Sequence, residues 1–213
     1  MKIQKPKLPE DLTFSTDMAN AVLDQQYSGF EVDKFYFKNS AMEDNFASRL
    51  LFYKCVFEKC TFNKGNSDFV FEDILFKDCD LANMDFCDAV FSSVEFINCN
   101  MTGINMSRAK FCDVLISECS MRYSIFSNAD FTRVSVEKTN LSNSYIWEAK
   151  QKDLNFTECN LTSVELAGTM LKGIDFTSCD IDGILLRGPE LKGVIVNEFQ
   201  ALSLSKLLGI IIK

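Results

Sequence analysis

A large apolar residue returns at every fifth position along most of the chain. From Phe71 to Val196 this spacing is unbroken over 26 positions, and 25 of them are Phe, Leu, Met, Ile or Val; the exception is Gln151. A helix repeats every ~3.6 residues and a strand every ~2, so neither element would keep residues five apart on one buried face. The pattern therefore predicts that the chain turns a corner within each group of five residues.

Similar residues also recur at intervals of twenty. Two positions before each central apolar residue the side chain is usually small, and one such column holds cysteines at twenty-residue steps. Twenty residues make four groups of five, which predicts a coil with four sides whose neighbours pair like parallel strands. We expect an all-β fold, a quadrilateral parallel β-helix with a short C-terminal helix, in which residues 71–198 span ~31 Å. The cysteine column is Cys79, Cys99, Cys119, Cys159 and Cys179.

The repeat divides the chain into three parts. Residues 1–29 are a non-repeat segment with a short helix expected over 16–23, residues 30–196 form the β-helix, and residues 197–213 form a C-terminal helix and strand. The open last coil of a solenoid needs such a cap, and an apolar cap invites a second copy, so we expect a dimer joined end to end. The expected dimer contacts are Phe199, Leu202, Leu207, Leu208 and Ile210.

The repeat is irregular at one place before its regular part. The step from Phe62 to Phe71 is nine residues instead of ten, which predicts a short loop or a skipped residue within 63–70. A skipped residue would place Cys60 in the cysteine column, and we favour it for that reason. At the C-terminal end, Asn197 is expected to cap the helix, Gly209 to end it, and residues 210–212 to form a short strand.

Composition and charge argue against several classes of function. The 213 residues include no histidine, the commonest general base and zinc ligand, so we expect no enzyme and no catalytic, cofactor or metal site. A net charge of −8 disfavours direct binding to nucleic acid and favours a basic partner. The N-terminal stretch lacks the apolar core of an export signal, and no apolar run reaches the ~18 residues of a membrane span. These features predict a cytoplasmic protein without membrane contact.

Two kinds of polar or reactive residue fall at inward positions. The cysteine column could act as a metal or redox ladder, because Cα atoms ~4.8 Å apart lie within reach of a disulfide. Parallel inward thiols in a reducing cell favour simple packing instead. Gln151, flanked by Lys150 and Lys152, would need hydrogen-bond partners if it pointed inward, so we expect a local distortion there.

Several short motifs resemble known repeats. The units CDLAN at 79–83, ADFTR at 129–133 and CNLTS at 159–163 resemble those of pentapeptide-repeat proteins, which implies a right-handed β-helix. The segments NLSNSYIWEA at 140–149 and LLRGPELKGVIVNEFQALSLSKLLGI at 185–210 are similar to the Qnr-type (Qnr/MfpA-like) fluoroquinolone-resistance group. That resemblance implies a bacterial cytoplasmic homodimer, joined through its C-terminal helices, that mimics DNA, binds DNA gyrase or topoisomerase IV, inhibits it and protects it from fluoroquinolones. A pentapeptide-repeat scaffold or an immunity protein with another partner is the alternative.

The outward charges supply candidates for partner binding. Residues 71–198 contain 20 acidic and 11 basic residues, whereas residues 1–70 are nearly neutral. A carboxylate line flanks the cysteine column, interrupted by Lys138, and would steer a basic cleft towards the rod. The alternative is the charged exterior that any soluble rod needs. Tyr145 and Trp147 are expected to be exposed as a possible contact patch. The expected partner-binding residues are Asp78, Asp80, Asp85, Glu118, Glu158, Asp180 and Asp182.

Overall fold

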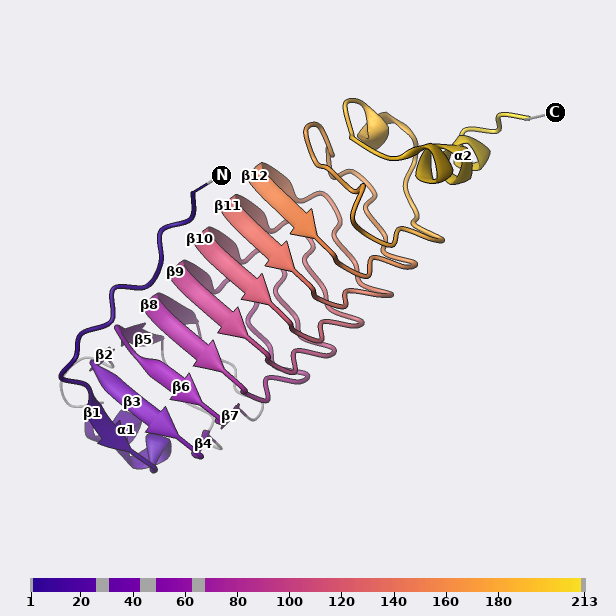
Figure 1. The fold of residues 1–213 in the computed structure, drawn as a ribbon. Coiled ribbons are helices and arrows are strands. Elements are labelled where there is room, and N and C mark those ends of the chain that lie inside the picture. The colour runs from indigo at the N-terminus through magenta and orange to yellow at the C-terminus, as the bar shows by residue number, and fades with distance from the viewer. Residues whose placement is uncertain (1, 26–30, 43–48, 63–67, 212–213) are drawn as a thin grey trace.

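The computed structural model describes residues 2–25, 31–42, 49–62 and 68–211. In these residues the chain winds into a rod of stacked coils, with strands of successive coils side by side (Figure 1). Parallel pairing joins most strands into one ten-stranded sheet, and β4 pairs with β7. The elements are β1 Thr13–Ser15, α1 Met18–Gln25, β2 Glu31–Asp33, β3 Phe35–Lys38, β4 Ala41–Met42, β5 Leu50–Tyr53, β6 Val56–Glu58, β7 Thr61–Phe62, β8 Phe69–Lys77, β9 Val90–Ile97, β10 Lys110–Ser117, β11 Asp130–Glu137, β12 Lys150–Thr157, η2 Pro189–Leu191 and α2 Glu198–Leu207. The predicted parallel β-helix is confirmed.

The register between coils is twenty residues in the regular part of the rod. Phe71 of β8 lies opposite Phe91 of β9, and the same offset continues to β12. The step before β8 is one residue shorter, because Phe57 of β6 lies opposite Phe76 of β8. The register thus contains the skipped residue that the sequence predicts. Residues 63–67, within the expected irregularity, and residue 30, the expected start of the repeat, lie outside the described residues.

Each coil turns its corners through residues with left-handed backbone conformation. A positive φ recurs at every fifth residue through much of the rod, as at Asp78, Asn83 and Asp88, whose φ angles are 54°, 57° and 62°. Asp and Asn tolerate this region better than other non-glycine residues, since their short polar side chains bond to nearby backbone. One residue in five therefore makes the corner that the five-residue period requires.

Stacked side chains of like kind fill the interior. The ring of Phe91 lies face to face with Phe71 at 5.3 Å and with Phe111 at 5.1 Å, measured between centroids. The cysteine column is buried as well, and the Cys79 thiol donates to the carbonyl of Phe57 in the preceding coil. Stacking at the coil spacing explains why like residues recur every twenty positions, since each side chain packs on its own kind.

One side of the rod is split after β12. In the described part of the chain, no backbone hydrogen bond joins residues 150–157 to residues 170–177 of the next coil. The other sides of these two coils stay paired, as Asn160 is with Asp180. A groove of about 670 Å³ lies at the split. Figure 1 shows the chain beyond β12 continuing as loops instead of strands on this side.

Gln151 bridges this split. Its backbone keeps the regular register opposite Phe131, so the strand itself is not displaced. Its side-chain amide donates to the carbonyls of Met170 and Lys172 at 3.2 and 3.3 Å. The distortion expected at Gln151 therefore lies between its coil and the next one, where the glutamine supplies hydrogen bonds that the backbone does not make.

The N-terminal part lies outside the coils. Residues 2–9 run along the length of the rod without helix or strand, from the level of β11 towards β1 (Figure 1). Strand β1 then pairs with β3, and Met18 and Val22 of α1 are buried against the first coil. The helix expected over 16–23 is thus present two residues later.

Helix α2 closes the other end. Asn197 and Gln200 form a reciprocal capping box, in which the Asn197 side chain accepts from the Gln200 amide at 3.0 Å. Gly209 follows the helix with a φ of 70°, as expected for its end. A strand is expected over 210–212, of which the structure describes residues 210 and 211. Ile210 and Ile211 are exposed and pair with no strand, since no further coil lies beside them.

Candidate partner-binding surfaces

The carboxylates predicted to bind a partner lie on the outside of the rod. Asp78 is half-buried and the other six are exposed. Five of the seven fall into two groups separated by several coils, because the column that runs from Asp80 to Asp180 contains neutral side chains between them. We call Asp78, Asp80 and Asp85 the N-terminal acidic group and Asp180 and Asp182 the C-terminal acidic group. Glu118 and Glu158 stand singly between these groups.

Each carboxylate of the N-terminal acidic group accepts a hydrogen bond from an asparagine one coil further along. An uncharged donor fixes the carboxylate in place without cancelling its charge. An Asp followed by Asn twenty residues later is a signal that the sequence contains and that could have been read once the period was known. The pairs are Asn98 with Asp78 at 2.7 Å, Asn100 with Asp80 at 2.9 Å, and Asn105 with Asp85 at 2.9 Å.

Two other aspartates are paired with arginines at the same spacing. The Nε of Arg108 donates to Asp88 at 2.8 Å, and the Nε of Arg133 donates to Asp113 at 2.7 Å. The Arg133 guanidinium holds the pKa of the Asp113 carboxyl at about 2, well below its usual value. These two carboxylates therefore add little net negative charge to the surface.

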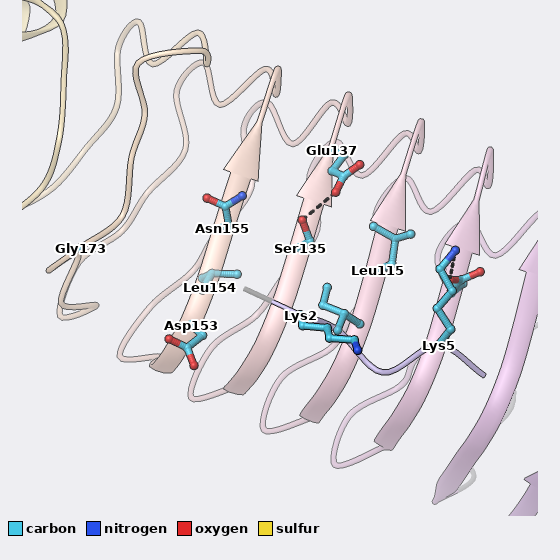
Figure 2. Close-up of a pocket in the computed structure, with 11 residues that line it drawn as sticks. Lys2, Lys5, Leu115, Ser135, Glu137, Asp153, Leu154, Asn155 and Gly173 are labelled. Carbon is cyan, nitrogen blue, oxygen red and sulfur yellow. Dashed lines mark hydrogen bonds and ion pairs between the residues drawn. The ribbon is translucent and has the colours of Figure 1, made fainter. Parts of the chain in front are cut away.

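A further set of carboxylates lies beneath the N-terminal segment, and the sequence did not single it out. We call residues 2–9 the strap and the outer surface of β8–β12 the strand face (Figure 2). The strap's backbone amides donate to aspartates, Lys7 to Asp73 at 3.0 Å and Gln4 to Asp113 at 3.2 Å. The Lys5 ammonium lies 3.7 Å from the Glu95 carboxylate. The strap has no periodicity, so the repeat gave no sign of where it would lie.

Family comparison agrees with this geometry. The family described as Pentapeptide repeat region matches residues 69–146, and the one described as Pentapeptide repeats (8 copies) matches residues 152–188. Together the two matches cover more than half of the chain. The chain belongs to the pentapeptide-repeat proteins.

Similar solved structures include forms of QnrB1, a plasmid-mediated fluoroquinolone resistance protein. One trypsin-treated variant is 18% identical over 86% of this chain and 100% of its own, with a TM-score of 0.44. Full-length QnrB1 is 23% identical over 93% of this chain and 97% of its own, with a TM-score of 0.37. HetL, from the cyanobacterium Nostoc sp. strain PCC 7120, is 13% identical over 83% and 96%, with a TM-score of 0.29. No curated protein sequence matches this one.

The C-terminal end of this pentapeptide-repeat protein presents exposed apolar side chains. Helix α2 packs on the last coil through Gln200, which donates to two backbone carbonyls, and through Leu204. Three other large apolar side chains of α2 and two that follow it are exposed. We call these residues the apolar end, with exposed fractions of 82% for Phe199, 47% for Leu202, 44% for Leu207, 52% for Leu208 and 53% for Ile210.

A small aromatic group lies on another side of this pentapeptide-repeat rod. Trp147 is exposed and Tyr145 half-buried, and their rings meet edge to face at 5.0 Å. The indole N–H of Trp147 donates to Glu165 at 3.2 Å. A hollow of about 390 Å³ adjoins Trp147, Glu165 and Arg187. Both aromatic rings are thus held by neighbours, and the patch they form is small.

Seven of the nine thiols are buried in the core of the pentapeptide-repeat coils. All nine cysteines are free, and the described residues contain no cluster of potential ligands that could hold a metal ion. Burial raises the pKa of the Cys55 thiol to about 12, which keeps it protonated. No helix in the described ranges is both long and apolar enough to cross a membrane.

Proposed function

We propose that this pentapeptide-repeat protein binds DNA gyrase or topoisomerase IV at the surface where the enzyme binds DNA. The observation that carries the proposal is the N-terminal acidic group, whose carboxylates are fixed on a stiff rod by asparagines of the next coil. A fixed carboxylate can take the place of a backbone phosphate without first losing conformational freedom. The similarity of residues 185–210 to the Qnr-type ending supports the same partner.

The charge of the rod favours mimicry of DNA by local groups of carboxylates over mimicry along the whole rod. Residues 71–198 carry a net charge of −9. Spread over the ~31 Å of that rod, this gives about half of the linear charge density of duplex DNA. Recognition therefore rests on the two acidic groups, which steer the rod towards a basic cleft, and not on the net charge.

The apolar end makes a homodimer part of the proposal. Five large apolar side chains at one end of a rod are a surface that a second copy would cover. An end-to-end dimer doubles the length over which carboxylates can meet the enzyme. It also places one N-terminal acidic group on each of the two rods.

Binding at the DNA-binding surface would have two effects on the enzyme, inhibition of supercoiling and protection from fluoroquinolones. A rod that occupies the DNA-binding surface displaces DNA, so it inhibits supercoiling and lowers the number of DNA complexes that a fluoroquinolone can trap. Many proteins of the Qnr-type group carry one loop near the start of the repeats and another in the middle of the rod. In this sequence the first is shortened to residues 63–70 and the second is absent. We expect inhibition to appear at lower protein concentration than protection.

A supercoiling assay with purified gyrase, with and without ciprofloxacin, tests the proposal. Neutralising the N-terminal acidic group by Asp78→Asn, Asp80→Asn and Asp85→Asn keeps the shape of each side chain and should weaken inhibition about tenfold. The matched control, Asp24→Asn, Glu31→Gln and Asp33→Asn, removes the same charge from exposed positions of α1 and β2 and should leave inhibition within about twofold. Unchanged supercoiling at micromolar protein would refute the proposal and favour a scaffold or immunity role with another partner.

A further inference from the structure

The strap is an extended peptide bound to the protein's own surface. Residues 2–9 form no helix or strand, and Pro6 and Pro9 favour an extended backbone before any docking occurs. Ile3, Pro6 and Leu8 are half-buried, while Gln4, Lys5 and Lys7 are exposed. The strap thus presents apolar side chains to the strand face and carries its charge outward.

The spacing of aspartates on the strand face matches an extended chain that crosses the coils. Asp73 and Asp113 are two coils apart, ~9.6 Å at ~4.8 Å per coil. The amides that bond to them belong to Lys7 and Gln4, three residues apart, which an extended chain spans in ~10 Å. Backbone amides, not side chains, make these contacts, so the row accepts any extended chain that has a free N–H at every third residue.

The row of aspartates continues beyond the strap. Asp153 lies two coils past Asp113 at the same position of the coil, since the register places 113 opposite 133 and 133 opposite 153. Asp73 and Asp113 are each only 8% exposed, whereas Asp153 is exposed. A cavity of about 630 Å³ begins at Lys2 and Ile3 and extends past Glu137 to Asp153. Figure 2 shows Asp153 and Asn155 on β12 beyond the strap.

We propose that the strand face is a docking surface for an extended basic segment of a partner protein, and that the strap occupies it in the free chain. Charge complementarity selects a basic occupant, because Glu95, Glu137 and Asp153 border the path. The strap is held by two hydrogen bonds from backbone N–H groups and by one ion pair whose lysine is 81% exposed. A longer basic segment that also reaches Asp153 can therefore displace it. This surface does not depend on a topoisomerase being the partner.

Two prolines release the strap without altering the surface beneath it. Gln4→Pro with Lys7→Pro removes both donating N–H groups, whereas Gln4→Ala with Lys7→Ala has the same charge and keeps them. The probe is a fluorescent synthetic peptide of the strap sequence, MKIQKPKLPE, followed by anisotropy. The proline variant should bind it about tenfold more tightly than the alanine variant, because the surface is no longer occupied. Equal affinities, or no binding to either variant, would overturn the proposal.

The aspartates supply the second arm of the test. Adding Asp73→Gly and Asp113→Gly to the proline variant removes both acceptors, suits the positive φ at these positions and should abolish binding of the peptide. A peptide with its three lysines changed to glutamine should bind about tenfold more weakly. Binding that survives both changes would show a non-specific contact and overturn the proposal. Circular dichroism of each variant checks that the rod is folded.

The unmodified chain gives an independent readout. In the ¹⁵N-labelled full chain, an excess of unlabelled peptide should shift the amide resonances of Gln4 and Lys7 to positions typical of unstructured peptides. Resonances of β8 and β9 should shift less, since one basic chain replaces another there. Amide resonances of Gln4 and Lys7 that stay unmoved at saturating peptide would contradict a displaceable strap. This peptide experiment does not involve gyrase, so its outcome is independent of whether the variants of the N-terminal acidic group inhibit gyrase.

Discussion

Truncating Phe91 should cost more stability than almost any other single change in the rod. Its ring is fully buried and contacts four other rings. It stacks on Phe71 and Phe111 at 5.3 and 5.1 Å and meets Phe86 and Phe96 at steep angles at 5.8 and 5.7 Å. Removing a buried Phe side chain costs ~3–5 kcal/mol, and the four ring contacts place Phe91→Ala at the upper end, ~4–5 kcal/mol. Phe91→Leu, which keeps most of the volume, should cost ~1–2 kcal/mol.

Phe199→Ala is the matched control when both variants also carry Leu202→Glu, so that no dimer contact is lost, because the same atoms are removed from a ring that is 82% exposed in the single chain. It should change the free energy of unfolding by less than ~0.5 kcal/mol. Urea titrations followed by circular dichroism, and by fluorescence of the chain's single tryptophan, Trp147, measure both effects. The two signals should shift together, because each coil is stabilised by its neighbours.

Three outcomes of these titrations would contradict rigid packing around Phe91 in a cooperative rod. A loss below ~2 kcal/mol for Phe91→Ala would mean that the coils close over the missing ring, contrary to the rigid stacking described above. Equal losses at Phe91 and Phe199 would mean that burial does not set the cost. Separate unfolding transitions in the two signals would show that the coils around Phe91 and Trp147 unfold independently.

Three further changes test particular contacts. Because Asp113 has a pKa of about 2 when folded and ~3.9 when unfolded, its ion pair with Arg133 stabilises the rod above about pH 4 and is lost as the pH falls towards 2. Asp113→Asn should therefore remove roughly 1–2 kcal/mol of stability at about pH 6 and little at about pH 2, in urea titrations. Gln151→Leu should cost about 1 kcal/mol and speed hydrogen exchange in residues 170–177, which Lys152→Leu should not do. Phe199→Glu with Leu202→Glu should give a mass near the 24.2 kDa of one chain by light scattering, whereas Phe14→Glu, at the other end, should leave a dimer.

The five-residue period was sufficient to predict most of the fold. It placed the core residues and the twenty-residue register, because each coil must repeat the contacts of the one below it. It also located the skipped residue before Phe71 and the Asn197 cap, since each breaks or ends the period at a definite position. The positions of the acidic residues on the outside follow from the same count.

The surfaces were harder to predict because they depend on contacts that the period does not encode. The strap has no repeat, and its amides bond to aspartates 66 and 109 residues away. The split after β12 depends on a change of backbone conformation in the next coil, and the sequence showed only the unusual Gln151. Gln200 was also missed, because a polar residue that satisfies two carbonyls in the last coil looks like any exposed glutamine.

The split after β12 makes the stiffness of the rod uneven. A stack of coils joined on every side resists bending in all directions, because any bend must stretch a row of backbone hydrogen bonds. Where one row is missing, a bend that opens that side strains mainly the two hydrogen bonds of Gln151. The molecule is therefore a stiff shaft from β8 to β12 with a compliant joint before its apolar end. In an end-to-end dimer two such joints would flank the junction, and the angle between the shafts could follow the curvature of the surface on which they lie.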